Sequence, residues 1–489
     1  MAQVYPFHPI RYTEQAGRPD TLVTQPYDKI SPAMQSRYLG LSPHNLVRII
    51  LGERKAGDSE TDNVYTRAAA YLNDWIATGI LARDNQPGVF PYFQEFTVPD
   101  TGERLLRKGF IALGAVEDYA AGVVHRHEQT LAGPKKDRME LLRHTHAHFG
   151  QIFMLYPDPA GSIDALLDEA ARAKPLAEVT DEYGAIHRMW KIADAGRIRQ
   201  LMADKKLLIA DGHHRYETAL AFHNENPRLA GADRVMMTFV NMHSPGLRIL
   251  ATHRLVTGVH VPGFPQAAAN DFQVEEIGSP DRLQQAWSQK PDRTIIGVAL
   301  GMRLYLMEAR EARGALDVQI LHQRILGKEL GIGEEAVRDE KHLRYIRGMD
   351  AALEEARQGK VQMAFLLKPT SIEQVANTSF GGGVMPQKST DFYPKLLSGL
   401  TIYRLELGPT APALGRRATR CFPAESWGRL SMPFYSESSV LVSKPTSSLY
   451  AIVTAAKVIG TVTSSPTSRQ QKPSTLTRNA RIRNMVKPK

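Results

Sequence analysis

A dense group of polar side chains follows a short apolar run in the middle of the chain, at Asp211-Gly212-His213-His214-Arg215. The run Leu207 to Ala210 predicts a buried strand, and the spacing from His213 onward predicts a helix. The group therefore lies at a strand–turn–helix junction, where free amides and a close-approaching glycine favour an anion such as phosphate. Arg215 could donate to phosphate oxygens, and Asp211 could accept a proton or bind magnesium. The alternative is a plain helix start with Asp211 as its N-cap.

A second polar group lies between Val123 and Arg143. Glu128 could act as a base or a magnesium ligand, and cations that follow it, including Arg138, could face phosphates. The alternative is a solvated loop that leads into a basic helix.

A third group is the glycine-rich run SFGGGVMPQKST, which places Lys388 and Ser389 after three glycines. It is not a P-loop, because Gln387 stands where glycine is needed before the lysine and Pro386 disrupts the phosphate cradle. A mobile loop that presents Lys388 to a bound anion remains an option.

The run TQPYDKISP and the following SPHNLVRII offer three further polar candidates. Asp28 could serve a substrate, and Asn45 and Arg48 could support it. The alternative is a structural turn that leads into a buried strand. In the run HTHAH, we expect His144, His146 and His148 to face solvent, because no third metal ligand is identifiable nearby.

The net charge of +10 comes from one end of the chain. Residues 409–489 hold 13 Lys or Arg and two acids, which leaves a net charge of −1 for residues 1–408. The body thus gives no reason to expect nucleic-acid binding. Cys421 is the single cysteine, so a disulfide framework and a cysteine-built zinc site are excluded. No segment resembles a secretory signal or a membrane span, so we expect a cytoplasmic protein.

Helical and strand patterns alternate over residues 1–408, without clean βαβ repeats, and predict an α+β (mixed α/β) body with a sub-boundary near residue 255. Residues 409–489 are a basic Ser/Thr/Pro-rich tail, for which we expect disorder, with a basic arm or a frameshifted gene end as alternatives. The predicted helices are Val64–Thr78, Asp137–His148, Ser162–Ala173, Arg197–Asp204, His213–Asn224, Pro280–Ser288, Leu316–Leu330 and Asp350–Gln358. The predicted strands are Asn45–Leu51, Val89–Thr97, Leu105–Leu113, Gln151–Leu155, Ala185–Ile192, Leu207–Ala210, Arg234–Val240, Thr294–Leu300, Leu304–Glu308 and Val361–Leu367.

The run LIADGHHRYETAL resembles the signature of an uncharacterised bacterial and archaeal family, the domain-of-unknown-function family ten-fifteen. Further runs that fit it, over nearly all of 1–407, are QPYDKIS, PHNLVRI, HEQT with KKDRMELL, IFMLY, NMHSPGLRILATHRLV, LDVQILH and MPQKSTDFYPKLLSGLTI. HTHAH is a departure from the family pattern.

The central motif is also similar to the phosphate-binding turn of the ParB/sulfiredoxin-like superfamily and of free serine kinases. That resemblance implies a ParB/sulfiredoxin-like core and phosphoryl transfer from a nucleotide to a small hydroxyl substrate. His213 stands at the position of the sulfiredoxin cysteine, so sulfinic acid reduction is excluded.

The resulting hypothesis is a nucleotide-binding protein that acts as a small-molecule kinase with ATP or ADP and magnesium, with free serine as the first acceptor to test. The alternatives are a nucleotide-dependent switch without turnover and a ParB-like nucleic-acid-associated protein. The oligomeric state stays open, with a homodimer among the options. The predicted site residues are Asp211, Glu128 and His214 for catalysis, Gly212, His213, His214, Arg215, Lys388 and Ser389 for the nucleotide, Asp28, Asn45, Arg48 and Arg138 for the substrate, and Asp211 and Glu128 for magnesium.

Overall fold

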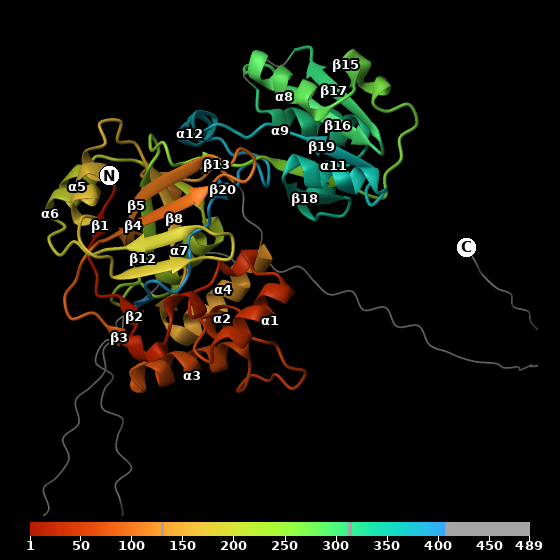
Figure 1. The fold of residues 1–489 in the computed structure, drawn as a ribbon. Helices are drawn as coiled ribbons and strands as arrows, with labels where there is room; N and C mark the ends of the chain where they lie inside the picture. Colours follow the sequence, from red (N-terminus) through yellow and green to blue (C-terminus); the bar gives the residue numbers. More distant parts are fainter. Residues whose placement is uncertain (129–131, 312–314, 406–489) are drawn as a thin grey trace, which may run out of the picture. The chain divides into compact units, whose positions relative to one another are not determined.

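The protein has an α+β fold, as the sequence predicts. A computed structural model describes residues 1–128, 132–311 and 315–405. The predicted basic tail, 409–489, lies outside these residues. Two separate sheets account for most strands of the described chain, and helices flank both (Figure 1).

The first sheet holds the strand that leads to the polar junction. Its inner strands are hydrophobic on both faces, and all residues of β8 are buried, which is typical of a strand covered on both sides. Strand β1 (Val4–Tyr5) pairs with β5 off the main path. The strand order is β6 (Val124–His125), β11 (Leu207–Asp211), β8 (Ile152–Tyr156), β12 (Arg234–Asn241), β5 (Arg104–Ala115), β4 (Phe90–Thr97), β10 (Ile186–Met189) and β9 (Ala177–Thr180).

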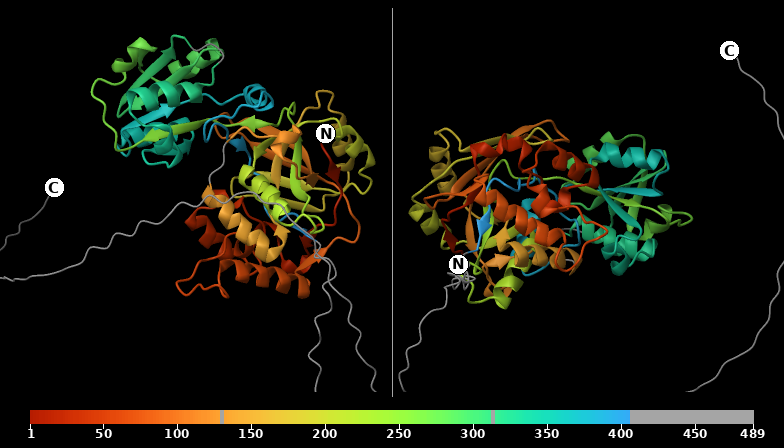
Figure 2. Two further views of the ribbon diagram at one scale, coloured as in Figure 1. Left: turned by 180° about the vertical axis from the view of Figure 1, so that it is seen from behind. Right: turned by 90° about the horizontal axis from the view of Figure 1, so that it is seen from below.

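Helices pack around this first sheet and against one another. Helix α7 contacts β8, β12 and α4, and α4 in turn contacts α3. The helices of the first 80 residues gather in one group with α4, in red and orange (Figure 2). The helices are α1 (Pro32–Leu41), α2 (Val47–Ile50), α3 (Val64–Ala77), α4 (Ala132–Thr145), α5 (Ser162–Ala170), α6 (Gly196–Met202), α7 (His213–Glu225) and α12 (Ile372–Phe380).

The second sheet begins at Thr252, close to the predicted sub-boundary near residue 255, and ends at Leu366. The chain then returns to the first part, so this sheet is an insertion rather than a C-terminal unit. The strand order is β15 (Phe272–Ile277), β17 (Arg303–Ala309), β16 (Ile295–Leu300), β19 (Met363–Leu366), β14 (Thr252–Val256) and β18 (Leu343–Arg347). Its helices are α8 (Pro280–Gln289), α9 (Asp317–Ile320), a π-helix (Leu321–Glu329), α10 (Glu334–Arg338) and α11 (Met349–Arg357).

Three short two-stranded ribbons tie distant parts of the chain together. Two of them hold the final described segment against earlier strands, and this positions the run around Lys388. They are β2 (Ile10–Tyr12) with β3 (Leu81–Arg83), β13 (Arg248–Ile249) with β20 (Phe392–Tyr393), and β7 (Ala147–His148) with β21 (Tyr403–Arg404).

Three predicted elements were wrong. Asn45–Leu51 is not a strand but contains helix α2, because the Asn45 side chain accepts from Val47 N–H and starts a helical turn. A short buried helix and a short buried strand have the same apolar sequence pattern, so the pattern does not distinguish them. The helix predicted to reach His148 ends at Thr145, and the one predicted over Leu316–Leu330 divides into α9 and the π-helix. Strands β14, β15 and β18 were missed.

Among the described residues, no helix combines the length and apolar character that a membrane span requires.

Candidate functional site

The polar junction forms where β11 ends and α7 begins. Gly212, not Asp211, is the N-cap residue, and no side chain caps the first turn. Gly212 has φ +96°, and a Cβ atom there would lie 3.0 Å from the Arg215 guanidinium. The positive φ and the lack of room for a Cβ atom therefore both require glycine at this position. The amides of the first turn of α7 have no capping side chain.

Asp211 anchors a chain of alternating charges. Its Oδ2 accepts from Arg215 Nη2 at 2.7 Å, and its Oδ1 lies 3.3 Å from Lys395 Nζ. Lys395 Nζ also lies 3.2 Å from Asp391 Oδ1, and Asp391 Oδ2 lies 2.6 Å from Arg347 Nη2. Lys395 is only 10% exposed along its side chain. This series of alternating charges links Asp211, at the end of β11 in the first sheet, to Arg347 in β18 of the second sheet.

The charges in this chain shift one another's pKa values. Burial by itself raises the pKa of Asp211, but Lys395, Arg215 and Lys29 outweigh burial and hold it below its ordinary value. The pKa of Asp391 is lowered in the same way, against burial, chiefly by Lys395 and Arg347. Burial opposes the charge on Lys395, yet Asp211 and Asp391 raise its pKa. All three groups are therefore ionised near neutral pH.

Lys395 lines a cavity of about 530 Å³, which we call the large cavity. Five cationic side chains line it against two carboxylates, so it is strongly basic. Three tyrosines, Tyr183, Tyr345 and Tyr393, contribute to its wall. The lining residues used below are Lys29, Tyr183, Arg344, Tyr345, Arg347, Lys388, Thr390, Asp391 and Lys395, with Glu340 as the second acid.

The backbone at Lys388 holds an unusual conformation at this wall. Lys388 has φ +57°, and its N–H donates to Glu128 Oε1 at 3.4 Å. The buried Arg254 donates to the Lys388 carbonyl at 2.9 Å. Burial raises the pKa of Glu128, while the Lys388 charge opposes that rise. The structure thus brings the predicted residues Glu128 and Lys388 together.

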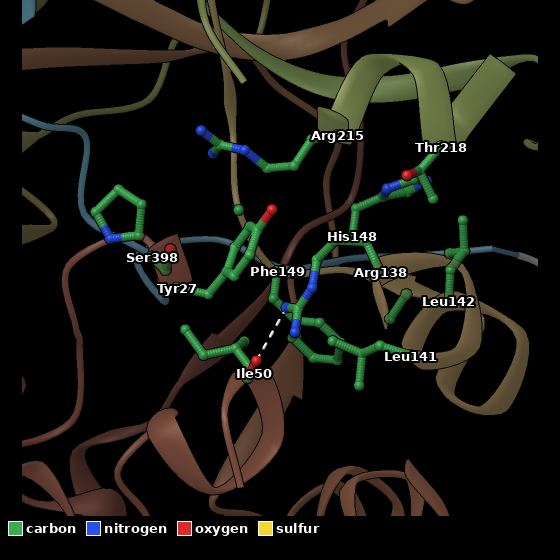
Figure 3. Close-up of a pocket in the computed structure, with 13 residues that line it drawn as sticks. Tyr27, Ile50, Arg138, Leu141, Leu142, His148, Phe149, Arg215, Thr218 and Ser398 are labelled. Carbon is green, nitrogen blue, oxygen red and sulfur yellow. Dashed lines mark hydrogen bonds between the residues drawn. The ribbon is translucent and has the colours of Figure 1, made fainter. Parts of the chain in front are cut away.

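Arg215 lines a different cavity, of about 60 Å³, which we call the small cavity (Figure 3). Arg215 reaches it from α7, and Arg138 from α4. The Arg138 guanidinium donates to the Ile50 carbonyl and lies 3.9 Å from the centre of the Tyr27 ring. Arg215 and Lys388 therefore line separate cavities, and the Asp211–Lys395 pair joins the two walls.

Several predicted site residues have structural partners instead. His213 is 7% exposed, and its Nε2 accepts from the His127 backbone N–H at 3.4 Å, so this ring atom already has a partner within the protein. Asn45 is fully buried and donates to the Thr21 carbonyl. Arg48 donates to the Leu39 carbonyl. The Ser389 hydroxyl donates to the Pro386 carbonyl at 2.5 Å.

Asp28 and His214 remain near the site. Asp28 belongs to a 3-10 turn (Tyr27–Lys29), is exposed, and lies 3.8 Å from Lys29 Nζ. Burial lowers the pKa of His214, and the charges of Glu217, Asp28 and Lys388 also act on it. His214 therefore lies within electrostatic reach of the segments that carry Asp28 and Lys388.

The histidines of HTHAH do not simply face solvent. His144 stacks on Tyr65, and His148 stacks on Tyr403 and lines the small cavity. His146 has φ +48°, because the chain leaves α4 there and turns into β7. The described residues contain no group of three metal-ligating side chains.

Six charged residues that line the large cavity were missed from the sequence: Lys29, Glu340, Arg344, Arg347, Asp391 and Lys395. Lys29 directly follows the predicted Asp28, and Asp391 and Lys395 stand in the same run as Lys388. The spacing of Asp391 and Lys395, four residues apart, was an available signal. Arg347 carries no local signal, because it arrives from the second sheet.

The predicted magnesium ligands do not fit a resident ion. Both Asp211 oxygens already accept from cationic donors, and Glu128 accepts from the Lys388 N–H. Magnesium prefers oxygen ligands free to coordinate it.

Comparisons with known proteins give weak structural likenesses and one family match. No curated protein matches the sequence. A free serine kinase in complex with AMP is 14% identical, with a TM-score of 0.34 over 58% of this chain and 89% of that one. A conserved hypothetical protein from Pyrococcus furiosus is 13% identical, with a TM-score of 0.30 over 55% and 87%. SbnI from Staphylococcus aureus, truncated at its C-terminus, is 11% identical, with a TM-score of 0.30 over 59% and 85%. These TM-scores are too low to support an inference about function.

The family match covers most of the described chain. Residues 4–324 match the family described as "Protein of unknown function (DUF1015)". This is the family ten-fifteen that the motif around Gly212 predicts. The chain therefore belongs to the DUF1015 family.

Proposed function

We propose that the protein binds ATP or ADP in the large cavity and transfers a phosphoryl group to a small hydroxylated metabolite, with free serine as the first acceptor to test. One observation carries this proposal: a cavity lined by five cations adjoins an ionised Asp–Lys–Asp–Arg chain at the head of a helix. Phosphoryl transfer depends mainly on positioning and on neutralising phosphate charge.

The volume of the large cavity and the residues that line it both suit a nucleotide. The volume of about 530 Å³ falls within the usual range for small-molecule sites. Tyr183 and Tyr345 offer ring faces on which a base could stack. The Tyr345 hydroxyl is buried and has no hydrogen-bond partner among the described residues, so a ligand could supply one.

The cations of the large cavity divide into those held by carboxylates and those that could move toward a ligand. Lys395 and Arg347 are held by Asp391 and Asp211, so they offer fixed positive charge at the wall. Lys29, at the end of the 3-10 turn, and Lys388, in a loop, would close on the phosphates.

The two carboxylates of the site suit different tasks. A general base works best when its pKa lies near the working pH. Glu128, whose pKa burial raises, suits proton removal from the acceptor hydroxyl better than Asp211, whose pKa its cationic neighbours lower. In this proposal Asp211 positions Lys395 and Arg215, and Asp28 and His214 lie at the acceptor side.

Magnesium would accompany the nucleotide rather than occupy a resident site. A nucleotide-borne magnesium ion is held largely by phosphates and water, and no step here is assigned to it. A nucleotide cosubstrate also agrees with the expected cytoplasmic location.

Calorimetry with ADP and ATP tests the proposal. Lys388→Met and Lys29→Met should each weaken nucleotide binding by roughly tenfold or more, because a hydrogen bond to a charged group contributes about 1.5–3 kcal/mol. Lys290→Met is the matched control, since Lys290 is 52% exposed and pairs with Glu308 on the second sheet.

Turnover is tested separately, by mass detection of phosphoserine after incubation with serine. Unchanged nucleotide affinity in both cavity variants would reject the large cavity as the site. Nucleotide binding without any phosphorylated product, across a panel of hydroxylated metabolites, would favour the nucleotide-dependent switch.

A further inference from the structure

His127 is a buried imidazole whose hydrogen bonds fix its tautomer. It is fully buried. Its Nδ1 lies 2.7 Å from the Ile209 carbonyl, and its Nε2 lies 2.9 Å from the Thr390 hydroxyl. A carbonyl oxygen only accepts, so Nδ1 must carry the proton. In the neutral ring Nε2 is then an acceptor, and the Thr390 hydroxyl donates to it.

The ring is held rigidly in this orientation. The His127 carbonyl accepts from Met385 N–H at 2.7 Å, and its N–H donates to His213 Nε2. The His127 and His213 rings pack edge to face, with centroids 4.7 Å apart. These contacts come from three separate segments, so they fix where Nε2 points.

Thr390 lies at the wall of the large cavity. It stands two residues after Lys388 and directly before Asp391, and Lys395 lines the same cavity. Its hydroxyl proton is directed inward to His127, which leaves the oxygen lone pairs available to the cavity. The neighbouring Ser389 differs, because its hydroxyl donates to a backbone carbonyl.

Nucleophilic hydroxyls are activated by a recurring arrangement of three groups. The hydroxyl donates its proton to an imidazole, and a third group orients that imidazole. Here the three are the Thr390 hydroxyl, the His127 ring and the Ile209 carbonyl. We propose that Thr390 is a nucleophile that accepts a phosphoryl group, with His127 as its base. This inference rests on the proposed function for its donor, a nucleoside triphosphate.

The step balances without a further reactant. Thr390 Oγ bonds to the terminal phosphorus, and the bond from that phosphorus to the bridging oxygen breaks. The electron pair leaves with the nucleoside diphosphate, and the Thr390 proton passes to His127 Nε2. The cations of the large cavity would neutralise the charge on the transferring group.

Mass spectrometry of the full chain tests the inference. The protein is incubated with ATP and magnesium or, separately, with acetyl phosphate, and peptides are then sequenced. The expected result is the added mass of one phosphoryl group on Thr390. A phosphoryl group on another residue, or none from either donor, overturns the inference.

The two proposals fail in different ways. Calorimetry in the same samples reports nucleotide binding directly. Binding without labelling of Thr390 overturns the nucleophile and leaves the proposed function standing. Labelling from acetyl phosphate without nucleotide binding supports the nucleophile and rejects ATP as the donor.

Variants separate nucleophile, base and neighbouring hydroxyls. Thr390→Ser should retain labelling and Thr390→Val should abolish it. His127→Gln should slow labelling by about 10²-fold, the lower end of the usual contribution of a general base, because burial lowers the pKa of this imidazole. Thr370→Val is the matched control, because the Thr370 hydroxyl donates to the Ser389 carbonyl and not to an imidazole. Circular dichroism confirms folding, and full labelling of a folded Thr390→Val variant would overturn the assignment.

Discussion

The two cavities near the head of α7 differ in size and in the way their cations are held. The small cavity, of about 60 Å³, contains Arg215 and Arg138, and both guanidiniums donate to backbone carbonyls. The large cavity, of about 530 Å³, gathers cations from loops and from the second sheet. Cations of the large cavity also have partners, because Lys395 pairs with Asp211 and Asp391, and Arg347 pairs with Asp391. The difference that favours the large cavity as the proposed ligand site is therefore its volume rather than the freedom of its cations.

The largest effect should come from Lys395→Met, which breaks the link between the two cavity walls. It leaves the Asp211 and Asp391 carboxylates without their shared cation. Removal of one partner from a buried pair costs about 3–5 kcal/mol, so we expect a loss of that order in urea unfolding. Lys290→Met, at an exposed pair, should cost about 0–1 kcal/mol. Equal losses of unfolding free energy in both variants would contradict the interpretation of Asp211, Lys395 and Asp391 as a buried series of ion pairs.

Gly212→Ala should have the next largest effect. Left-handed backbone costs a non-glycine residue about 1–2 kcal/mol, and the added methyl group meets the Arg215 guanidinium, which adds overpacking of about 1–3 kcal/mol. Gly301→Ala is the matched control, because Gly301 has φ +57° and open space around its Cβ position. Thermal unfolding should separate the two variants. If Gly301→Ala destabilises as much, the Arg215 contact contributes nothing.

A smaller effect is expected from pH, through one histidine beside each cavity. Burial lowers the pKa of His148, at the small cavity, and of His127, at the large one, to about 4. Between pH 6.5 and 4 the unfolded chain binds protons at these residues and the native chain does not, so stability falls as pH decreases. His148→Phe should reduce the loss between pH 7 and pH 5 by about 1–2 kcal/mol, measured by urea unfolding at both pH values. An unaltered pH dependence would mean that His148 is not held neutral.

The smallest effect should come from Tyr27→Leu in the small cavity. The variant removes the ring beneath the Arg138 guanidinium, which contributes about 0.5–1 kcal/mol. Nucleotide affinity should stay unchanged by calorimetry, because the proposed ligand site is the other cavity. A clear loss of affinity would move the proposed site to the small cavity.

Local sequence patterns were informative wherever chemistry and periodicity agreed within one segment. The apolar run before Asp211 and the helical spacing after His213 predicted β11 and α7 correctly. The prediction for Asn45–Leu51 failed, because a four-residue buried helix and a buried strand share the same apolar run. The His213 ring was assigned to a ligand because a sequence does not show which way a side chain at a helix start points.

The sequence by itself determined that a strand–turn–helix junction forms at Gly212, since the strand run, the glycine and the helical period lie in one continuous segment. Only the tertiary structure decided which cations meet at a cavity, because Lys29, Arg347 and the segment that holds Lys388 and Lys395 lie far apart in the chain. It also decided that the pKa of Asp211 is lowered and that of Glu128 raised, because burial and neighbouring charge, rather than residue type, set these shifts.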